Sequence, residues 1–318
     1  MANITAAQVK ELRDKTGAGM MDCKKALVET DGNLEEAVDA LRQKGLAAAK
    51  KKAGRITSEG SVSALISEDG KSGALLEVNC ETDFVAKNPD FVEFVKNLTN
   101  HIIAKAPKVL KAEDGEGALL DQPFIANEEK TVGDTLPDLI GIIGENISPR
   151  RFERWELNGS GLLNSYIHMG GKLGVMVELE CSEEAAKNEA VAAFSKQLAM
   201  HAAASNPLCL NRDGVPEDVL EREKAIYKTQ ILESGKPENL VDKIMVGKVN
   251  KFYKENCLLE QIWVHDTALT VTKAAAAISK EVGSEVTIKR YARYLLGEGL
   301  EKRSNDLAAE VAEQLEGK

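Results

Sequence analysis

GKSGALLEVNC (residues 70–80) is the stretch that decides the fold, because a second copy of it, GKLGVMVELEC (residues 171–181), follows later in the chain. In each copy, glycines precede a run in which the side chains alternate in character with a period of two, the pattern of a half-buried strand in a β-hairpin. The inward faces of the two predicted strands carry Ala74, Leu76, Val78 and Cys80, and Val175, Val177, Leu179 and Cys181. Glu77 and Glu178 are expected to point outward. An internal repeat of this kind predicts two structural units that are built alike.

The repeat continues downstream of these strands. Matching residues recur first at an offset of 100 and then at an offset of 139, and they include His101 with His201, Phe124 with Trp263, and Arg151 with Arg290. Apolar spacing predicts a helix after each hairpin, and Asn88 and Pro89 supply the N-cap and the first position of the first such helix. Each unit is therefore predicted to contain a β-hairpin, a helix, a second helix and a third strand.

The second unit carries an insertion between Pro207 and Gln261, which accounts for the larger offset. Two helical patterns within it are separated by a break at GKP (residues 235–237), and each has a thin apolar stripe and many charges. We interpret residues 213–257 as an antiparallel helical hairpin that meets another subunit or partner, with a simple solvated arm as the alternative. A short amphipathic tail helix is expected to follow, bearing Leu307, Val311 and Leu315.

Three short helices with tight turns are predicted at the front of the chain, ending near residue 45. Thr5 and Gln8 have the spacing of a capping box, and Asn33 can cap the third helix. Met20 and Met21 open the second helix, and neighbouring helical residues point about 100° apart, so both cannot face a small core. One interpretation buries one of them, and the other leaves one exposed as an adaptable contact for a partner. The module resembles a ubiquitin-associated (UBA) domain, a fold that binds other proteins.

These elements predict an α+β fold with a duplicated core. We expect a three-helix UBA-like domain with its linker at residues 1–54 and core subdomain 1 at residues 55–158. Core subdomain 2, with the inserted hairpin, is expected at residues 159–296, and a C-terminal module at residues 297–318.

Composition favours a cytoplasmic protein without a nucleic-acid or membrane partner. The 318 residues carry a formal net charge of −10, and an acidic chain gains nothing from counterion release on a phosphate backbone. The basic segment KKKAGR (residues 50–55) is typical of a solvated helix end that runs into a linker. Five dispersed cysteines without a CxxC pair indicate reduced thiols. The N-terminus has no signal-peptide pattern, and no apolar run reaches membrane-spanning length.

The two copies differ most sharply where the strand leads into the helix. The first copy has CETDFVAKN (residues 80–88), whereas the second has CSEEAAKN (residues 181–188). Phe84 and Val85 therefore stand where the second copy has glutamate or alanine. One interpretation packs Phe84 under its own sheet. The other makes it an exposed wedge, and we favour it because the sister copy closes the same turn without an aromatic residue.

Two long motifs resemble the signature segments of the translation elongation factor Ts family. They are LRDKTGAGMMDCKKAL (residues 12–27) and EVNCETDFVAK (residues 77–87). Shorter segments are also similar to that family: GENI (residues 144–147), SYIH (residues 165–168), SGKP (residues 234–237) and GEGLEK (residues 297–302). The resemblance extends from Ile4 to the expected last helix and is loosest at residues 108–130.

The resemblance implies a guanine-nucleotide exchange factor for elongation factor Tu, the GTPase that delivers aminoacyl-tRNA to the ribosome. It implies that Met20 and Met21 contact the GTPase domain of Tu, and that His168 is a further contact. It also implies that the loop of Thr82, Asp83, Phe84 and Val85 dislodges Mg²⁺ from the nucleotide site of Tu. In this family the tail helix also returns to Tu, and the inserted hairpin makes some members homodimers.

Two other classes of function are alternatives to an exchange factor. An enzyme is disfavoured because the four histidines are scattered and no nucleophile–base spacing or metal-ligand cluster is present, so we expect neither catalysis nor a cofactor. His101 and His201 occupy equivalent positions, which favours a structural role for both. A ubiquitin-like adaptor is the second alternative, and it rests on the three-helix front module alone.

Overall fold

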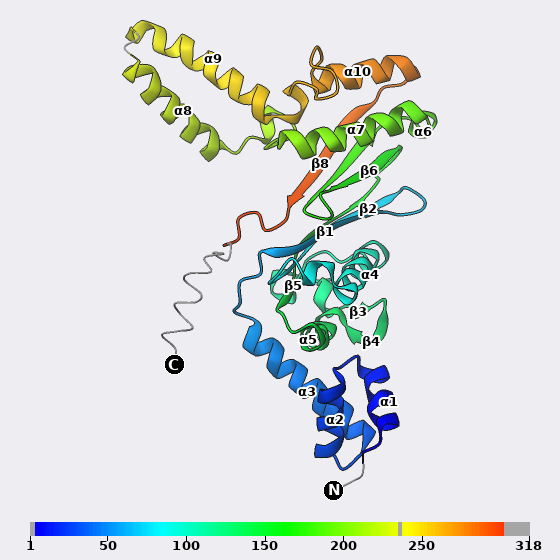
Figure 1. The fold of residues 1–318 in the computed structure, drawn as a ribbon. Helices are drawn as coiled ribbons and strands as arrows, with labels where there is room; N and C mark the ends of the chain where they lie inside the picture. Colours follow the sequence, from blue (N-terminus) through cyan, green and yellow to red (C-terminus); the bar gives the residue numbers. More distant parts are fainter. Residues whose placement is uncertain (1–3, 235–236, 302–318) are drawn as a thin grey trace. The chain divides into compact units, whose positions relative to one another are not determined.

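The structure is a computed structural model that describes residues 4–234 and 237–301, and it mixes helices with small sheets (Figure 1). The α+β class expected from the sequence is therefore confirmed. The chain divides into two compact units. Unit 1 comprises Met1–Ser63, Leu76–Phe152 and Leu295–Lys318, and unit 2 comprises Ala64–Leu75 and Glu153–Tyr294. The expected tail helix, with Leu307, Val311 and Leu315, and residues 235–236 of the predicted break lie outside the described residues.

The first three helices share a small core of their own. They are α1 (Ala6–Thr16), α2 (Met20–Glu29) and α3 (Leu34–Lys52). The predicted capping box is present, because the Thr5 side chain accepts from the backbone of Gln8 and the Gln8 side chain accepts from the backbone of Thr5. The buried residues of the bundle come from all three helices: Val9, Leu12, Cys23, Ala26, Leu27 and Ala37.

The third helix is longer than expected. The bundle was expected to end near residue 45, and α3 continues beyond that point to Lys52. Residue 45 lies against another helix, α5 (Val132–Ile143), where a Cβ would come within 3.2 Å of the Pro137 carbonyl oxygen. Gly45 therefore permits close helix packing and does not end the helix. The last turn carries three lysines, as expected for a solvated helix end, and they complement the helix dipole.

Two three-stranded sheets organise the rest of the described chain. Their strands are β1 (Glu59–Ile66), β2 (Ser72–Cys80) and β5 (Ile147–Glu156) in the order β1-β2-β5, and β6 (Gly161–His168), β7 (Leu173–Glu180) and β8 (Thr287–Leu295) in the order β6-β7-β8. In both sheets the second strand of the hairpin is central and a distant strand closes the other side. A short additional sheet pairs β3 (Pro123–Phe124) with β4 (Asn127–Thr131).

Glu77 does not face solvent, so that expectation from the period-two pattern was wrong. Its side chain is 0% exposed on the central strand β2. The carboxylate accepts hydrogen bonds from Arg150 Nη1 at 3.0 Å, Arg151 Nε at 2.6 Å and the backbone N–H of Gly297 at 2.8 Å. Burial disfavours the charged form, but the Gly297 N–H and the two arginines outweigh it and lower the pKa of Glu77.

Glu178 was also expected to face solvent, and it too is buried, at 8% exposed. It accepts from Arg290 Nε at 2.6 Å, and that guanidinium lies over the Trp155 ring at 4.4 Å from its centroid. A central strand is covered on both faces. In β2 and β7, alternate side chains therefore form two buried faces. One face is apolar, and on the other a buried glutamate forms ion pairs.

Helices and short 3₁₀ turns follow each hairpin. After β2 come η1 (Val85–Lys87), α4 (Pro89–Lys105), η2 (Ala112–Asp114), η3 (Leu119–Asp121) and then α5. After β7 come α6 (Glu183–Ala186), α7 (Glu189–Ser205), η4 (Arg212–Gly214), α8 (Glu217–Glu233), α9 (Glu238–Asn256), η5 (Leu258–Glu260) and α10 (Val271–Val282). The Asn88 side chain caps α4 and Pro89 is its first residue, as predicted.

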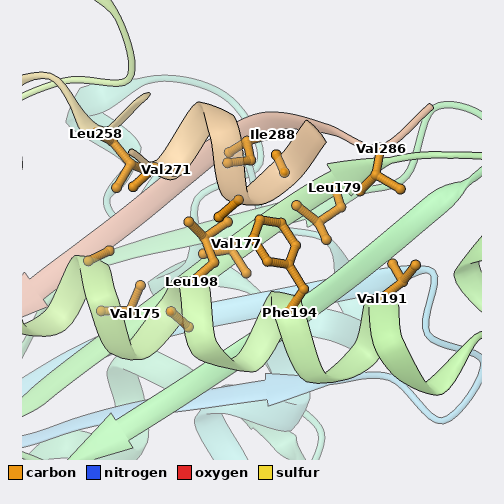
Figure 2. Packing of buried hydrophobic residues seen from close by; sticks show 14 of the residues in the cluster. Val175, Val177, Leu179, Val191, Phe194, Leu198, Leu258, Val271, Val286 and Ile288 are labelled. Atoms are coloured by element: carbon orange, nitrogen blue, oxygen red, sulfur yellow. The ribbon is translucent and has the colours of Figure 1, made fainter. Parts of the chain in front are cut away.

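The main core of unit 2 lies where β7, α7, α10 and β8 meet. Figure 2 shows Phe194 and Leu198 of α7 gathered with Val177 and Leu179 of β7 and with Val271 of α10 in one apolar cluster. Phe194 also packs against Trp263, with ring centroids 5.6 Å apart. The inward face predicted for this strand is thus buried.

The insertion forms the helix pair expected from its sequence. Helices α8 and α9 pack along each other, with Ile231 and Phe252 as their buried apolar residues. Lys248 joins the two helices, since its Nζ donates to Gln230 Oε1 at 2.8 Å and lies 5.0 Å from the Tyr227 ring centroid. Few apolar residues are buried in this hairpin, and polar contacts between its helices supplement them.

Candidate partner-binding site

Phe84 lies in the loop between β2 and α4 with its side chain 80% exposed. The interpretation that packs it under its own sheet is therefore wrong, and the exposure that we favoured from the sequence is observed. Burying a phenylalanine on a partner contributes about 1.5–3 kcal/mol, so an aromatic ring held in water is a ready contact for another protein.

The neighbouring Val85 has the opposite environment. Its side chain is 9% exposed, within the turn that precedes α4. The Val85 N–H donates to Thr82 Oγ1 at 3.3 Å, and the Asn88 N–H donates to the Val85 carbonyl at 2.9 Å. Val85 therefore anchors the loop in unit 1, while Phe84 projects from it.

A carboxylate that lies 63 residues further along the chain braces the loop. The Thr82 N–H donates to Glu145 Oε2 at 2.9 Å, and the Thr82 hydroxyl donates to Glu145 Oε1 at 2.6 Å. Beside this pair, the Asn146 N–H donates to Glu81 Oε1 at 2.7 Å. Bidentate acceptance by one carboxylate fixes both the backbone and the side chain of Thr82, and hence the start of the loop.

Two further contacts hold the ends of the loop. The Cys80 thiol donates to the Thr82 carbonyl at 3.1 Å, and burial raises the pKa of Cys80 to about 12, so the thiol keeps its proton. Asp83 forms an ion pair with Lys87 at 2.9 Å. Both groups are largely exposed, so this pair contributes little to stability.

The second copy has the same turn without the aromatic residue or the carboxylate brace. The Ser182 hydroxyl accepts from the Ala185 N–H at 3.2 Å, as Thr82 does from Val85. Ala185 is buried and Glu184, the counterpart of Phe84, is exposed. The partner of Ser182 is the Ser284 hydroxyl at 3.1 Å, at the position that corresponds to Glu145. Only the first copy therefore combines an exposed ring with a charged brace.

Met20 and Met21 are both exposed, at 47% and 64%, on the first turn of α2. The interpretation that buries one of them is therefore wrong, because Cys23, Ala26 and Leu27 supply the core face of this helix. Both thioethers are free to contact a partner.

His168 ends strand β6 in unit 2 and is exposed. Its Nδ1 lies 2.9 Å from the Tyr166 hydroxyl, and the two rings stack with centroids 5.7 Å apart. Tyr166 packs against the apolar core, so it holds the imidazole in a defined position. The candidate residues thus lie on separate elements: α2, the loop after β2, and the end of β6.

The two matched histidines have the same surroundings in their respective units. His101 Nε2 lies 3.0 Å from Gln122 Oε1 and its Nδ1 accepts from the Ile125 N–H at 3.2 Å. His201 Nε2 lies 3.0 Å from Gln261 Oε1, and the Val264 N–H donates to His201 Nδ1 at 3.2 Å. Burial lowers the pKa of both, and both positions have the satisfied contacts of structural histidines.

Residues 4–234 and 237–301 offer neither a metal-binding cluster nor a membrane-spanning helix. These residues contain no group of three or more histidine, cysteine or acidic side chains placed to hold a metal ion. Within the same residues, every helix is too short or too polar to cross a bilayer.

Comparison with known proteins gives one consistent family. The family model described as Elongation factor TS matches residues 81–298, which includes the Phe84 loop. An elongation factor Ts from Clostridium kluyveri is 51% identical over 315 residues, covering 99% of this chain and 100% of that protein. One from Clostridium botulinum is 51% identical over 312 residues, covering 98% of each chain. The protein is thus a translation elongation factor. Within that class, the chain belongs to the elongation factor Ts family.

Sequence reasoning missed the residues that support the loop. Glu145 and Asn146 belong to the GENI segment that the resemblance singled out, but nothing local assigns them a partner, because Glu145 contacts Thr82 across 63 residues. A signal was nevertheless present: where the first copy has glutamate at position 145, the second has serine at position 284.

Proposed function

We propose that this protein is a guanine-nucleotide exchange factor that acts on elongation factor Tu, dislodges Mg²⁺ from its nucleotide site and promotes GDP release so that GTP can bind. Membership of the elongation factor Ts family supports the partner. The single observation that carries the mechanism is the exposed Phe84 ring on a loop anchored by Val85 and braced by Glu145.

The physical basis of this proposal is linkage. An exchange factor must bind nucleotide-free Tu more tightly than nucleotide-bound Tu. By linkage, the nucleotide weakens the binding of the exchange factor to Tu to the same extent that the exchange factor weakens the binding of the nucleotide. Mg²⁺ bridges the phosphates and the protein, so its loss removes much of the hold on GDP. If the Phe84 ring is buried only in the Mg²⁺-free state, about 1.5–3 kcal/mol biases Tu toward that state, roughly ten- to hundredfold.

The test is the release of fluorescent GDP from Tu with wild-type protein and with Phe84→Ala. We expect the variant to keep forming the complex but to lose most of the stimulation at saturating concentration. Phe84 is exposed and makes no core contact, so the variant should fold normally. A matched control is Ile262→Ala, which removes another largely exposed apolar side chain, in unit 2.

GDP release at wild-type speed with Phe84→Ala would refute the wedge role. If the wild-type protein itself left GDP release unchanged, the proposed exchange function would be wrong as a whole. Equal losses in Phe84→Ala and Ile262→Ala would mean that general surface hydrophobicity, and not the loop, drives the effect.

The remaining contacts extend the same proposal. Met20 and Met21 are assigned to the GTPase domain of Tu, supported by the exposure of both side chains. Thr82 and Asp83 are assigned to the Mg²⁺-displacing loop with Phe84, and the burial of Val85 supports an anchoring role for that residue. His168 is assigned a contact with Tu, supported by its exposure beside Tyr166.

The finer description of the fold belongs to the proposal as well. We propose that α1 to α3 form a UBA-like module and that the core arose by duplication. In support, the two sheets share one strand order, and His101 and His201 have equivalent hydrogen bonds. The domain boundaries expected from the sequence stay a prediction. We propose no catalysis and no cofactor of its own for this chain.

We further propose that the α8–α9 hairpin is where two copies meet if the protein dimerises. Exposed apolar residues on both helices support this: Ile226, Leu232, Leu240 and Val246. We propose the cytoplasm as the location of the exchange reaction, since translation elongation takes place there. The net charge of −10 favours a protein partner over direct binding to nucleic acid, and we propose no membrane partner.

A further inference from the structure

Cys209 and Cys257 come together at the base of the α8–α9 hairpin. They are 48 residues apart in sequence, but their sulfur atoms lie 3.7 Å apart. Both are reduced and buried, Cys209 at 9% exposed and Cys257 at 0%. Spacing does not indicate this pair, because the five cysteines are dispersed along the chain.

The backbone holds these two cysteines side by side. Cys209 and Cys257 form a parallel β-bridge. The Leu258 N–H donates to the Cys209 carbonyl at 2.9 Å, and the Leu208 N–H donates to the Asn256 carbonyl at 2.8 Å. Bridged strands lie about 4.7–4.9 Å apart, which is inside the range of about 4.4–6.8 Å between the Cα atoms of a disulfide. The sulfur atoms can therefore bond without a rearrangement of the chain.

The first copy of the repeat indicates that this position does not require thiols. Its equivalent bridge joins Val109 to Ala118, and the Leu119 N–H donates to the Val109 carbonyl at 2.8 Å. Small apolar side chains are thus sufficient to pack this bridge. The second copy has two cysteines here, at the one place where the inserted hairpin leaves and rejoins the body of unit 2.

We propose that Cys209 and Cys257 are an oxidation site, at which a low-molecular-weight disulfide converts the two thiols into a reversible disulfide that ties the base of the helical hairpin. The closed loop would run from residue 209 to residue 257 and would contain both hairpin helices. This proposal is independent of the exchange function.

The chemistry is two successive thiol–disulfide exchanges. The Cys209 sulfur, as thiolate, attacks one sulfur of the small disulfide, forms a mixed disulfide and releases one small thiol. The Cys257 sulfur then attacks the Cys209 sulfur and expels the second small thiol. Two protein thiols are oxidised, one small disulfide is reduced to two thiols, and the two protein protons end on those thiols.

The surroundings determine the order and the rate of these steps. Cys209 is the more exposed of the two, so it is the sulfur that an oxidant reaches first. Burial raises the pKa of Cys209, and burial is also the main cause that raises the pKa of Cys257 to about 12. Because the thiolate is the nucleophile, oxidation should be slow at neutral pH and faster at higher pH.

The experiment incubates the full-length, reduced protein with excess glutathione disulfide overnight at pH 8. Remaining thiols are then alkylated in denaturant and the protein is digested for mass spectrometry. We expect the number of alkylated cysteines to fall from five to three, with one cross-link that joins the peptides of Cys209 and Cys257. Dithiothreitol should restore all five.

Matched variants separate the disulfide from simple packing. Cys209→Val with Cys257→Ala copies the first repeat, so it should fold, keep three free thiols and form no cross-link. Each single variant should give at most a glutathione adduct on the remaining cysteine. The proposal is overturned if the wild-type protein keeps five free thiols, if its only products are glutathione adducts, or if Cys23, Cys80 or Cys181 enters the cross-link instead.

Discussion

Replacing Glu145 with alanine should weaken the action of the protein on Tu without removing any residue that we assign to the contact. Glu145 accepts two hydrogen bonds from Thr82, at 2.9 and 2.6 Å. A hydrogen bond to a charged group contributes about 1.5–3 kcal/mol, and these groups are partly exposed, so we take the lower value for each. The two together then favour the ordered loop by about 3 kcal/mol, which sets an upper limit of roughly a hundredfold on the loss.

The assay is fluorescent-GDP release from Tu, measured over a range of factor concentrations. A loop that is ordered only part of the time raises the apparent dissociation constant, because binding must also order the loop. We therefore expect Glu145→Ala to raise the half-saturating concentration about ten- to hundredfold while the maximal release rate stays close to that of the wild type. Phe84→Ala should do the opposite and lower the maximal rate.

The control is Ser284→Ala, which alters the equivalent position of the second copy, where the contact is between two hydroxyl groups. It should leave the half-saturating concentration unchanged. A double-mutant cycle with Thr82→Ala then tests the pair itself, since the two substitutions together should cost less than the sum of their separate effects. An unchanged half-saturating concentration in Glu145→Ala would refute the bracing role.

Two further predictions concern stability. His101 and His201 have lowered pKa values, so below pH 6.5 the unfolded state binds more protons than the folded state. Their stabilising contribution should be complete above pH 6.5 and fall as the pH drops toward the pKa of the folded state. The urea midpoint of the wild-type protein should therefore decrease in that pH range. The decrease should be smaller in the double variant His101→Gln, His201→Gln. Glu77→Ala should destabilise unit 1 by about 3 kcal/mol, because it removes the buried carboxylate that pairs with both Arg150 and Arg151. Glu178→Ala removes the carboxylate that pairs with a single arginine, so urea denaturation should show a smaller loss of stability. Equal losses of stability in the two variants would contradict this account.

The parts of the fold that depend on neighbouring residues could be predicted from the sequence. The capping box of Thr5 and Gln8 and the cap at Asn88 are local, so their signals lie within a few residues. The difference between Phe84 and Glu184 could also be found in the sequence, because the two copies of the repeat can be compared with each other. Exposure of Phe84 followed from that contrast.

Contacts between distant residues could not be predicted in this way. The alternation around Glu77 reports polarity, but whether a polar face meets water or an arginine depends on Arg150, which lies 73 residues away. The contact of Glu145 with Thr82 and that of Cys209 with Cys257 also join residues far apart in the sequence, so neither could be predicted from local patterns. The sequence left open whether one of Met20 and Met21 is buried, because the 100° step between neighbouring helical residues excludes only the burial of both. The structure places Cys23, Ala26 and Leu27 on the core face of α2 and leaves both methionines exposed.

The backbone hydrogen bonds at the base of the α8–α9 hairpin form a short ladder, and this ladder explains how the chain could gain or lose the hairpin. Residues 208–210 and 256–259 are joined by backbone hydrogen bonds, so the insertion starts and ends at adjacent points. The first copy keeps the same ladder between residues 108–110 and 117–120, with a short connection. Segments whose ends lie this close can be gained, shortened or exchanged without disturbing the domain that carries them. The hairpin is therefore a detachable module, and a chain trimmed to the short connection should retain the body of unit 2.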